Sequence, residues 1–436
     1  MFVGYREDID LAQFDKELQG RPFAFFQPIL SIEDKQIVGY EALARGKTKE
    51  GKTVSLGKIF LRHDIPLHEL YSVDLAVRED AIRRFAKSGL YYKRKLFLNI
   101  MPRWLEVLNP EENLEQALPI LKLIEKYGIP PSSVVLEITE GEFGLSPERF
   151  DQVICFLKSK GFSIAIDDFG AGFSNVHRIA LMRPHYIKLD LHLIQKGFSD
   201  LIVREILHSI AHLCDKIGSI LLLEGVETEQ DFYAALDIGA RYVQGYFFGH
   251  PSFEIQSLFF LDITVEEFLK DFRTRKLEEV RALLLFRETL ADHFVKKAET
   301  YFRKVQINGI ASLEPCNPEN IPPYWHRFMR LAFVVNDYGI QISPNYRLRQ
   351  NGESLYWEEE RTYIGKDWSW RPYFQYFIAQ KDILEKNRAI SEPYRDITTG
   401  ESIVTLLYQF NPGTILCLDF SVAHLEESGL KRLGLP

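Results

Sequence analysis

Short apolar runs alternate with longer amphipathic segments from about residue 21 to 251, and this alternation restricts the possible folds more than any other feature. Each run has the length of a strand and is rich in Ile, Val, Leu, Phe and Tyr. Because they are apolar almost throughout, the runs are typical of strands buried on both faces, as in a parallel sheet. They are PFAFFQPIL, QIVGYEAL, LFLNIM, SVVLEIT, FSIAIDDF, HYIKLDL, SILLLEG and YVQGYFFG.

Two folds are built from repeated strand–helix units, an open doubly wound sheet and a closed (β/α)8 barrel. Eight strand candidates within about 230 residues favour the barrel. No G-x-G-x-x-G fingerprint follows the first strand candidate, which disfavours a dinucleotide-binding sheet. The sequence therefore predicts an α/β barrel over residues 1–260.

The chain of 436 residues is too long for one typical core. Residues 264–305 contain neither Gly nor Pro and place apolar residues at helical spacing, which predicts a helix of about 60 Å. We expect a connecting helix over 261–305. Residues 306–436 then show the strand candidates RLAFVVND, YRLRQNG, SIVTLLYQF and TILCLDFSV, which predict a smaller α+β domain on an antiparallel sheet.

Charge and hydropathy exclude several kinds of partner. The net charge of -8 disfavours binding to a nucleic-acid polymer, which needs clustered Lys and Arg. The N-terminal residues do not have the pattern of a signal peptide, and no apolar run approaches the roughly 20 residues of a membrane span. We therefore expect a cytoplasmic protein with no membrane contact.

Seven consecutive strand candidates end in a polar or charged residue. In a parallel barrel these ends meet on one face, which is where barrel active sites lie. A lone Asp or Asn after a strand is more often a turn former or a helix cap, but Lys, Gln and three Glu residues are not favoured in those roles. The residues are Glu41, Asn99, Glu137, Asp167 with Asp168, Lys188, Glu224 and Gln244.

These side chains suit a metal-dependent reaction on an anionic substrate. The carboxylates of Glu41, Glu137 and Asp167, with the amide oxygen of Asn99, form an all-oxygen ligand set that suits Mg²⁺ or Mn²⁺ and not zinc. The adjacent Asp168 could help to hold a second ion. Lys188 and Arg45 point to a phosphate ester as substrate. Glu224 could deprotonate or orient the attacking water.

The motifs as a set resemble the EAL-domain family of cyclic di-GMP phosphodiesterases. FFQPIL, GYEALAR, FLNI, LEITE, DDFGAGFSN, YIKLD, EGVE and QGYFFGHP occur in the family's order over about residues 20–252. The resemblance implies a modified TIM (β/α)8 barrel whose first strand is antiparallel to the others. It also implies a cyclic-guanylate-specific phosphodiesterase that cleaves cyclic di-GMP to linear pGpG with Mg²⁺ or Mn²⁺.

The resemblance also implies roles for individual residues. Glu41, Asn99, Glu137 and Asp167 match the metal ligands, and Asp168 matches the residue that reaches a second metal. Lys188 and Glu224 match the lysine that holds water or phosphate and the proposed general base. Glu227 matches a residue that supports catalysis, and Glu140 matches the anchor of the DDFG loop. The residues that match groups near the nucleotide are Gln27, Leu43, Arg45, Asp190 and Gln244.

Three positions depart from the family's usual motifs. Ala171 and Phe173 replace the usual Thr and Tyr of the DDFGTGYSS loop, so two hydroxyl groups are lost. This loop links the metal site to the dimer interface in the family, so the lost hydroxyl groups bear on its gating. Leu223 stands where Ala is usual before EGVE, and could shift Glu224.

The C-terminal section resembles PAS-like sensor domains of the Cache type through VVNDYGIQIS, DWSWRPYF and SEPYRDITTGESIVT. The resemblance implies a small-molecule pocket at Arg371, Tyr373 and Asp396. An alternative is structural, with Arg371 paired to an acid and Tyr373 in the core. Without a membrane span, such a domain would sense a molecule inside the cell.

Two functions of different classes stay open. The complete set of ligand types favours a cyclic di-GMP phosphodiesterase controlled by the C-terminal domain. The alternative is a receptor that binds cyclic di-GMP with little or no turnover. A metalloenzyme acting on an unrelated anion would need different motifs. The resemblance and the long helix both predict a homodimer.

Overall fold

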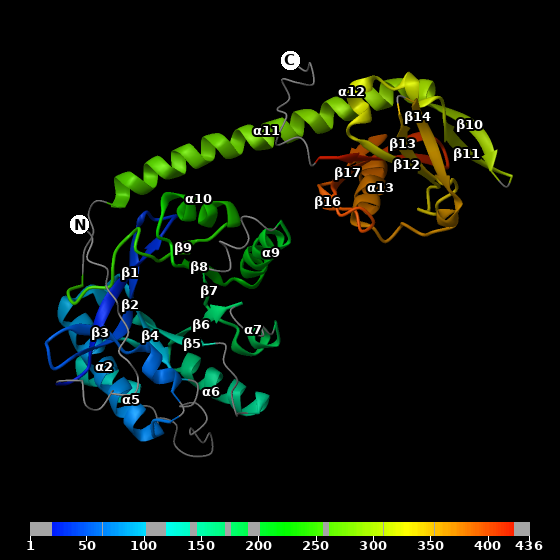
Figure 1. Ribbon diagram of the computed structural model, residues 1–436. Coiled ribbons are helices and arrows are strands. Elements are labelled where there is room, and N and C mark those ends of the chain that lie inside the picture. Colours follow the sequence, from blue (N-terminus) through cyan, green and yellow to red (C-terminus); the bar gives the residue numbers. More distant parts are fainter. Residues whose placement is uncertain are drawn as a thin grey trace. The chain divides into compact units, whose positions relative to one another are not determined.

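The computed structural model describes residues 20–62, 64–101, 119–139, 146–170, 176–190, 201–255, 261–307, 309–352 and 354–422. The chain divides into two compact units, Met1–Phe272 and Arg273–Pro436 (Figure 1). Among the helices in these described ranges, none combines the length and the apolar character needed to cross a membrane.

The first unit is a closed barrel of eight strands, as the sequence predicts. Neighbouring strands are parallel, except that β1 is antiparallel to both β2 and β9. A short turn with Lys35 at φ +55° joins β1 to β2, and so tight a connection permits only antiparallel pairing. The strands are β1 Phe23–Ser31, β2 Gln36–Lys47, β4 Lys95–Ile100, β5 Val134–Thr139, β6 Ser163–Phe169, β7 Tyr186–Asp190, β8 Ile220–Glu224 and β9 Tyr242–Val243.

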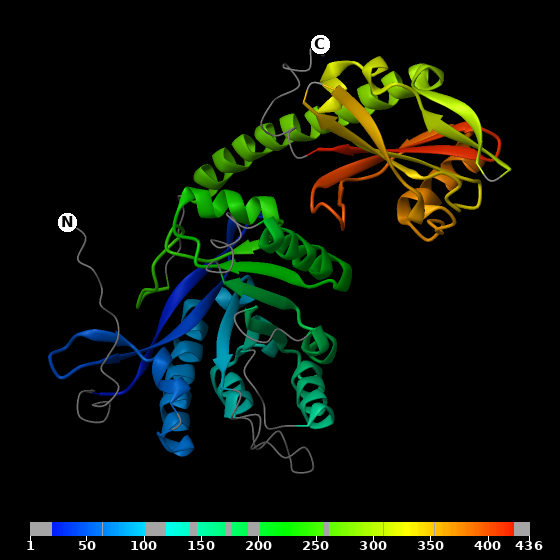
Figure 2. The same cartoon turned by 45° about the vertical axis from the view of Figure 1, so that its right-hand side comes forward.

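A further short strand, β3 Thr53–Ser55, pairs with the end of β2, and the two extend past the barrel as a hairpin (Figure 2). Helices surround the barrel strands (Figure 1). Their ends follow local sequence signals: Ser146 accepts the Arg149 N–H at the start of α6, and Thr228 and Asp231 form a capping box at the start of α10. The helices are α2 Leu67–Ser88, α5 Pro119–Tyr127, α6 Pro147–Ser159, α7 Val176–Met182, α9 Leu201–Ile217 and α10 Glu229–Ile238.

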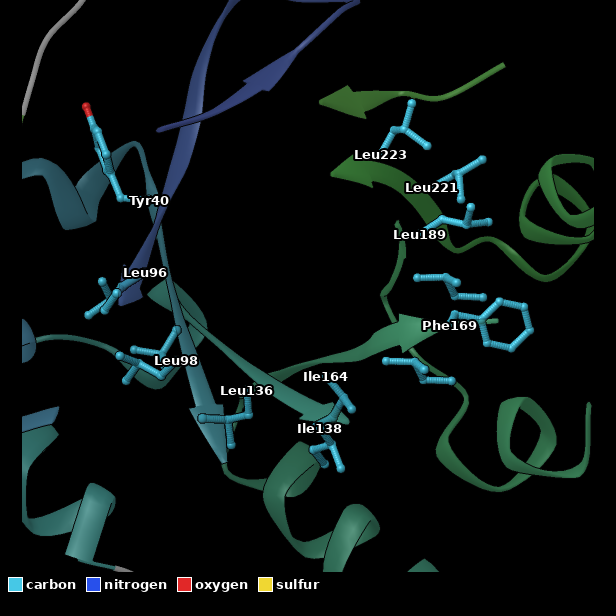
Figure 3. Packing of buried hydrophobic residues seen from close by; sticks show 14 of the residues in the cluster. Tyr40, Leu96, Leu98, Leu136, Ile138, Ile164, Phe169, Leu189, Leu221 and Leu223 are labelled. Atoms are coloured by element: carbon cyan, nitrogen blue, oxygen red, sulfur yellow. The ribbon is translucent and has the colours of Figure 1, made fainter. Parts of the chain in front are cut away.

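Alternation along each strand divides the barrel side chains into two sets. One set faces the helices and forms the main core, and Figure 3 shows ten of its labelled members, among them Leu96, Leu136 and Leu189. The other set fills the barrel interior with an apolar inner layer: Ile29, Phe97, Val135, Ala165, Tyr186 and Leu222. Each fully buried Ile, Phe, Val or Leu side chain of this layer contributes roughly 1.5–3 kcal/mol relative to exposure.

Gly39 makes room for this layer. A Cβ at Gly39 would lie 2.8 Å from both the Lys95 carbonyl oxygen and the Phe97 ring. Because Gly39 has no side chain, the Phe97 ring can pack directly against it in the barrel interior.

Helix α11, Leu261–Tyr301, contributes to the cores of both units. Val265, Phe268 and Leu269 pack against the barrel core, and Phe286 and Phe294 lie in a core of the second unit. The helix ends four residues before the predicted position 305, because Phe302 begins strand β10. Pairing with β11 outweighs the helical spacing of these last residues.

The second unit is built on an antiparallel sheet in the order β14-β13-β12-β18-β17-β15, with β16 beside β17. The four predicted strands are present as β12 Met329–Val335, β13 Asn345–Asn351, β17 Ser402–Asn411 and β18 Thr414–Ser421. The structure adds β10 Phe302–Ile307, β11 Ile310–Pro315, β14 Ser354–Glu360, β15 Arg388–Ile390, β16 Tyr394–Arg395, α12 Pro323–His326 and α13 Pro372–Leu384. Short 3₁₀ helices occur at Gly57–Leu61, Leu90–Tyr92, Pro131–Ser133, Pro318–Asn320 and Arg361–Tyr363.

The two faces of this sheet carry different cores. One face packs with α11 and Trp325, and the other packs with Phe374 and Phe377 of α13. The predicted smaller α+β domain is therefore present, whereas its likeness to PAS and Cache domains stays a prediction.

Candidate functional site

A polar inner layer lies directly beyond the apolar inner layer, one inward position farther along each strand. Phe97 is followed by Asn99, and Val135 by Glu137, two residues later. In β1 the order is reversed, with Gln27 before Ile29, because this strand runs in the opposite direction. The layer comprises Gln27, Glu41, Asn99, Glu137, Asp167, Lys188, Glu224 and Gln244.

Lys188 is the centre of the polar inner layer. Its Nζ lies 2.6 Å from Oε1 of Glu137 and 2.6 Å from Oε1 of Glu224. Oδ1 of Asp167 is 3.0 Å away and Oε2 of Glu41 is 3.6 Å away. The Lys188 and Glu137 side chains are 1% and 0% exposed, so these ion pairs are almost completely shielded from water.

Amide side chains add hydrogen bonds to this cluster. Nδ2 of Asn99 donates to Glu41 and Glu137, at 3.0 and 3.3 Å. Nε2 of Gln244 donates to Glu41 at 2.6 Å and to Gln27 at 3.2 Å. Among the described residues, the buried Oε1 of Gln244 accepts no hydrogen bond. The site thus retains a buried acceptor that a ligand could use.

The negative charge around Lys188 exceeds its single positive charge. Burial would by itself lower the pKa of Lys188, but the surrounding carboxylates raise this pKa well above its ordinary value, so Lys188 stays charged. Burial and the neighbouring Glu41 raise the pKa of Glu137 well above its ordinary value. Burial also raises the pKa of Glu224 to about 8. One ammonium group therefore does not fully compensate these acids.

Asp168 joins the site from the end of β6. It has a positive φ of 54°, and its backbone N–H donates to Oδ1 of Asp167 at 3.1 Å. Burial raises the pKa of Asp168 to about 6. Asp167, Asp168 and Glu224 each offer a carboxylate oxygen, and these atoms lie within 4.8 Å of one another.

The donor set fits a divalent cation of the magnesium type. Carboxylate and amide oxygens are its preferred ligands, and a bound ion would offset the burial and the repulsion between carboxylates that raise the pKa values of Glu137 and Glu224. Asn99 directs its Nδ2 towards Glu41 and Glu137, so a role as ligand requires its amide to turn and present Oδ1.

The predicted nucleotide-contacting residues Leu43 and Arg45 continue the Glu41 face of β2 towards the barrel mouth. Leu43 is half-buried and lies opposite Phe25. Arg45 is buried, donates to the Ala44 carbonyl at 3.0 Å, and places its Cζ 5.5 Å from the Phe25 ring centre. Asp190 lies at the end of β7, paired with Glu224 of β8.

Some predicted residues are not part of this cluster. Glu227 lies beyond β8 and is exposed, and its backbone N–H donates to Asp231. Leu223 lies on the helix-facing side of β8, away from the polar layer, and is fully buried there (Figure 3). Glu140, Ala171 and Phe173 lie outside the described residues.

In the second unit, Arg371 and Tyr373 lie at the start of α13. Within the described residues, the Arg371 guanidinium contacts aromatic rings and no acid: its Cζ is 4.8 Å from the Trp370 ring centre and 6.0 Å from that of Tyr394. Tyr373 stacks on Tyr394 at 5.7 Å between ring centres. Asp396 shapes the following turn, where its Oδ1 accepts the Thr398 N–H at 2.7 Å.

A buried acid beside these residues escaped the sequence analysis. Asp419 of β18 is 5% exposed, and burial raises its pKa to about 7. Its Oδ1 accepts from Thr405 at 2.7 Å, and Thr405 is 2.7 Å from the Tyr394 hydroxyl. The available signal was an acid within the apolar run TILCLDFSV, at a position that alternation places on the α13 face.

Two family models match the chain: an EAL domain at residues 12–251, and an EAL-domain associated signalling protein domain at residues 321–430. An uncharacterized EAL-domain containing protein of Bacillus subtilis, YkuI, is 31% identical over 412 residues, or 93% of this chain and 96% of YkuI. The Pseudomonas aeruginosa cyclic di-GMP phosphodiesterase RocR is 28% identical over 52% of this chain and 57% of RocR.

A solved structure resembles most of this chain. The crystal structure of Bacillus subtilis YkuI, in complex with substrate cyclic di-GMP and calcium, has a TM-score of 0.81 and 27% identity, and the match covers 95% of this chain and 100% of that chain. With the barrel topology, the motif set and the two family models, these comparisons show that the chain belongs to the EAL-domain family and carries the signalling domain associated with it.

Proposed function

We propose that the barrel hydrolyses cyclic di-GMP to linear pGpG with Mg²⁺ or Mn²⁺. The observation that supports this most is the crowding of four carboxylates around the buried Lys188 at the strand ends. Relatives named as cyclic di-GMP phosphodiesterases, and the YkuI complex with cyclic di-GMP and calcium, support the choice of substrate and of a divalent ion.

In the proposed site, Glu41, Asn99, Glu137 and Asp167 hold the ion, and Asp168 reaches towards a second one. The bound ion would polarise the phosphate and stabilise charge on its oxygens. Lys188 adds a fixed positive charge to the same place. Its contact with three carboxylates keeps its ammonium group in position for this role.

The reaction needs a base and an in-line water. Glu224 accepts a proton from the water, whose oxygen then forms a bond to phosphorus. The bond between phosphorus and the ribose 3′ oxygen breaks, and that oxygen takes up a proton from solvent water. Glu224 lies in the polar inner layer, with its Oε1 2.6 Å from Nζ of Lys188, which favours its carboxylate form at this place. Glu227 and Glu140 support the site, and Gln27, Leu43, Arg45, Asp190 and Gln244 contact the nucleotide.

An alternative is a receptor that binds cyclic di-GMP with little or no turnover. Binding and chromatography of the product, measured on the same purified protein with Mn²⁺, separate the two functions. The phosphodiesterase predicts pGpG from the native chain and loss of at least about 100-fold in rate for Glu41→Ala, because an ion ligand is lost. Tight binding without product would refute hydrolysis and favour the receptor.

The second unit is proposed to regulate the barrel by binding a small polar molecule near Arg371, Tyr373 and Asp396. Among the described residues the Arg371 guanidinium contacts no acid, and Asp419 is buried nearby, so both offer polar groups that a ligand could satisfy. A metabolite screen by thermal shift on the full chain tests it. The proposal predicts a compound that raises the melting temperature of the native chain and not of Arg371→Ala.

A further inference from the structure

Three phenylalanines stand at the barrel mouth beside the polar inner layer. Phe23 and Phe25 precede Gln27 on the inward face of β1, opposite Arg45 and Leu43 of β2. Phe253 reaches the same place because Phe26 and Ser252 form a backbone bridge. We call Phe23, Phe25 and Phe253 the mouth aromatics.

The mouth aromatics are held in place without being buried. Phe253 is 48% exposed, and Phe23 and Phe25 are half-buried. Ring centres are 5.8 Å apart for Phe23 and Phe25, 5.8 Å for Phe23 and Phe253, and 6.3 Å for Phe25 and Phe253. These are the separations of edge-to-face aromatic pairs, so the three rings support one another.

Arg84 of α2 fixes Phe253 from outside the barrel. Its Cζ lies 4.2 Å from the Phe253 ring centre, and its Nη1 donates to the Phe253 carbonyl at 2.5 Å. Arg84 is in turn bound to Asp80 on the same helix. A half-exposed ring with this much support loses little conformational freedom when a ligand packs against it.

Core packing does not explain the mouth aromatics, because none of the three belongs to a buried hydrophobic cluster of the described residues. Single exposed apolar residues need no explanation, but three adjacent aromatic rings continuous with a polar site indicate a ligand surface. The same strand pair carries, in order, Glu41 opposite Gln27, Leu43 opposite Phe25, and Arg45 opposite Phe23. An apolar surface thus adjoins a cation and a carboxylate cluster.

We propose that the mouth aromatics form the surface on which one guanine base of the cyclic dinucleotide stacks. The identity of the ligand rests on the proposed function. A purine offers a flat π face to the rings, while the nearby Arg45 complements the phosphate charge. Stacking of this kind does not read base edges, so it strengthens binding of either purine and leaves the choice of guanine to polar groups.

The test compares Phe253→Leu, which keeps apolar volume but removes the π face, with Phe253→Trp, which enlarges it. Equilibrium binding of cyclic di-GMP is measured on the full chain in Ca²⁺, and kcat and KM are measured in Mn²⁺. Tyr92→Leu is the matched control, because Tyr92 is 78% exposed and precedes β4 at the opposite end of the barrel. Titration of Mn²⁺ alone reports on the integrity of the carboxylate cluster.

Stacking predicts that Phe253→Leu weakens cyclic di-GMP binding about tenfold. KM should rise with kcat and Mn²⁺ affinity unchanged, and Phe253→Trp should bind as well as the native chain or better. The proposal is overturned if Phe253→Leu binds cyclic di-GMP like the native chain, or if Phe253→Trp binds it as weakly as Phe253→Leu. It is also overturned if Phe253→Leu loses Mn²⁺ affinity to the same extent as cyclic di-GMP affinity. Absence of pGpG from the native chain would instead count against hydrolysis, and the binding comparison would still decide the stacking.

Discussion

Lys188 is the residue on which the polar inner layer depends. Its ammonium group lies within 3.0 Å of three carboxylates and is almost inaccessible to water. Buried charges of like sign are costly unless a counter-charge is close. Lys188 therefore acts both as part of the proposed chemistry and as the cation that lets the barrel fold around its acids.

Replacing Lys188 with Met should destabilise the protein by about 3–5 kcal/mol, because buried carboxylates lose their partner. Urea unfolding in the presence of a chelator measures this. Lys126→Met is the matched control: Lys126 pairs with Glu79 but is 59% exposed, and solvent screens an exposed pair, so this variant should lose much less stability. Equal losses in the two variants would contradict the central role of Lys188.

Gly39 offers a second test at the residue scale. Gly39→Ala would place a methyl group 2.8 Å from Lys95 O and the Phe97 ring, which should cost about 1–3 kcal/mol through overpacking. Gly57→Ala serves as control, since its new Cβ would meet nothing closer than Ser55 Oγ at 3.8 Å. Thermal unfolding of both variants checks the difference, and indistinguishable melting temperatures would refute the steric account.

The site residues differ in how far the sequence could predict them. Glu41, Glu137, Lys188 and Glu224 each end an apolar run, so strand period and barrel topology place them on one face. Phe253 carries no such signal, because its position depends on a backbone bridge to β1 that joins residues far apart in the sequence. Contacts of this kind follow from tertiary register and not from local pattern.

At the scale of elements, β1 shows that the direction of a strand decides which of its inward residues lie at the barrel mouth. Its inward residues run Phe23, Phe25, Gln27 and Ile29, from the mouth to the apolar inner layer, whereas the parallel strands run the other way.

The eight barrel strands were predictable because each is a separate apolar run. The end of α11 was not, because Phe302 fits helical spacing and only its pairing partner Pro315, in β11, shows it to be a strand residue.

Strand β18 provides a pH-dependent test. The pKa of Asp419 is about 7 in the folded protein and 3.8 ordinarily, so the native state holds this proton more tightly than the unfolded state. The stability that this proton provides is complete below about pH 4 and is lost as pH rises towards about 7. Asp419→Asn removes this loss and retains an oxygen for Thr405.

Unfolding free energies of native chain and Asp419→Asn, measured between about pH 4 and pH 8, should therefore diverge in favour of the variant as pH rises, and then stay apart. The acids of the barrel titrate in both proteins, so the difference in unfolding free energy between them reports on Asp419 alone. Parallel stability curves over this range would contradict the burial of an uncompensated carboxyl in the sheet.

On the scale of the whole molecule, the chain combines a barrel that contains the polar inner layer with a sheet unit that has its own polar cluster. Helix α11 supplies side chains to the cores of both units. In the sequence, the spacing of apolar residues changes from strand-length runs to a long helical repeat and back, which indicated a connecting helix between two parts. Regulation of the barrel by the second unit, and the expected homodimer, stay predictions.

The most direct test of the account is the initial rate of pGpG formation from cyclic di-GMP as Mn²⁺ is titrated into metal-free full-length protein. A divalent ion held by the carboxylates of the polar inner layer predicts a rate that rises from background, saturates with Mn²⁺ and returns to background with a chelator. Bound cyclic di-GMP that stays intact at every Mn²⁺ concentration would contradict hydrolysis at this site.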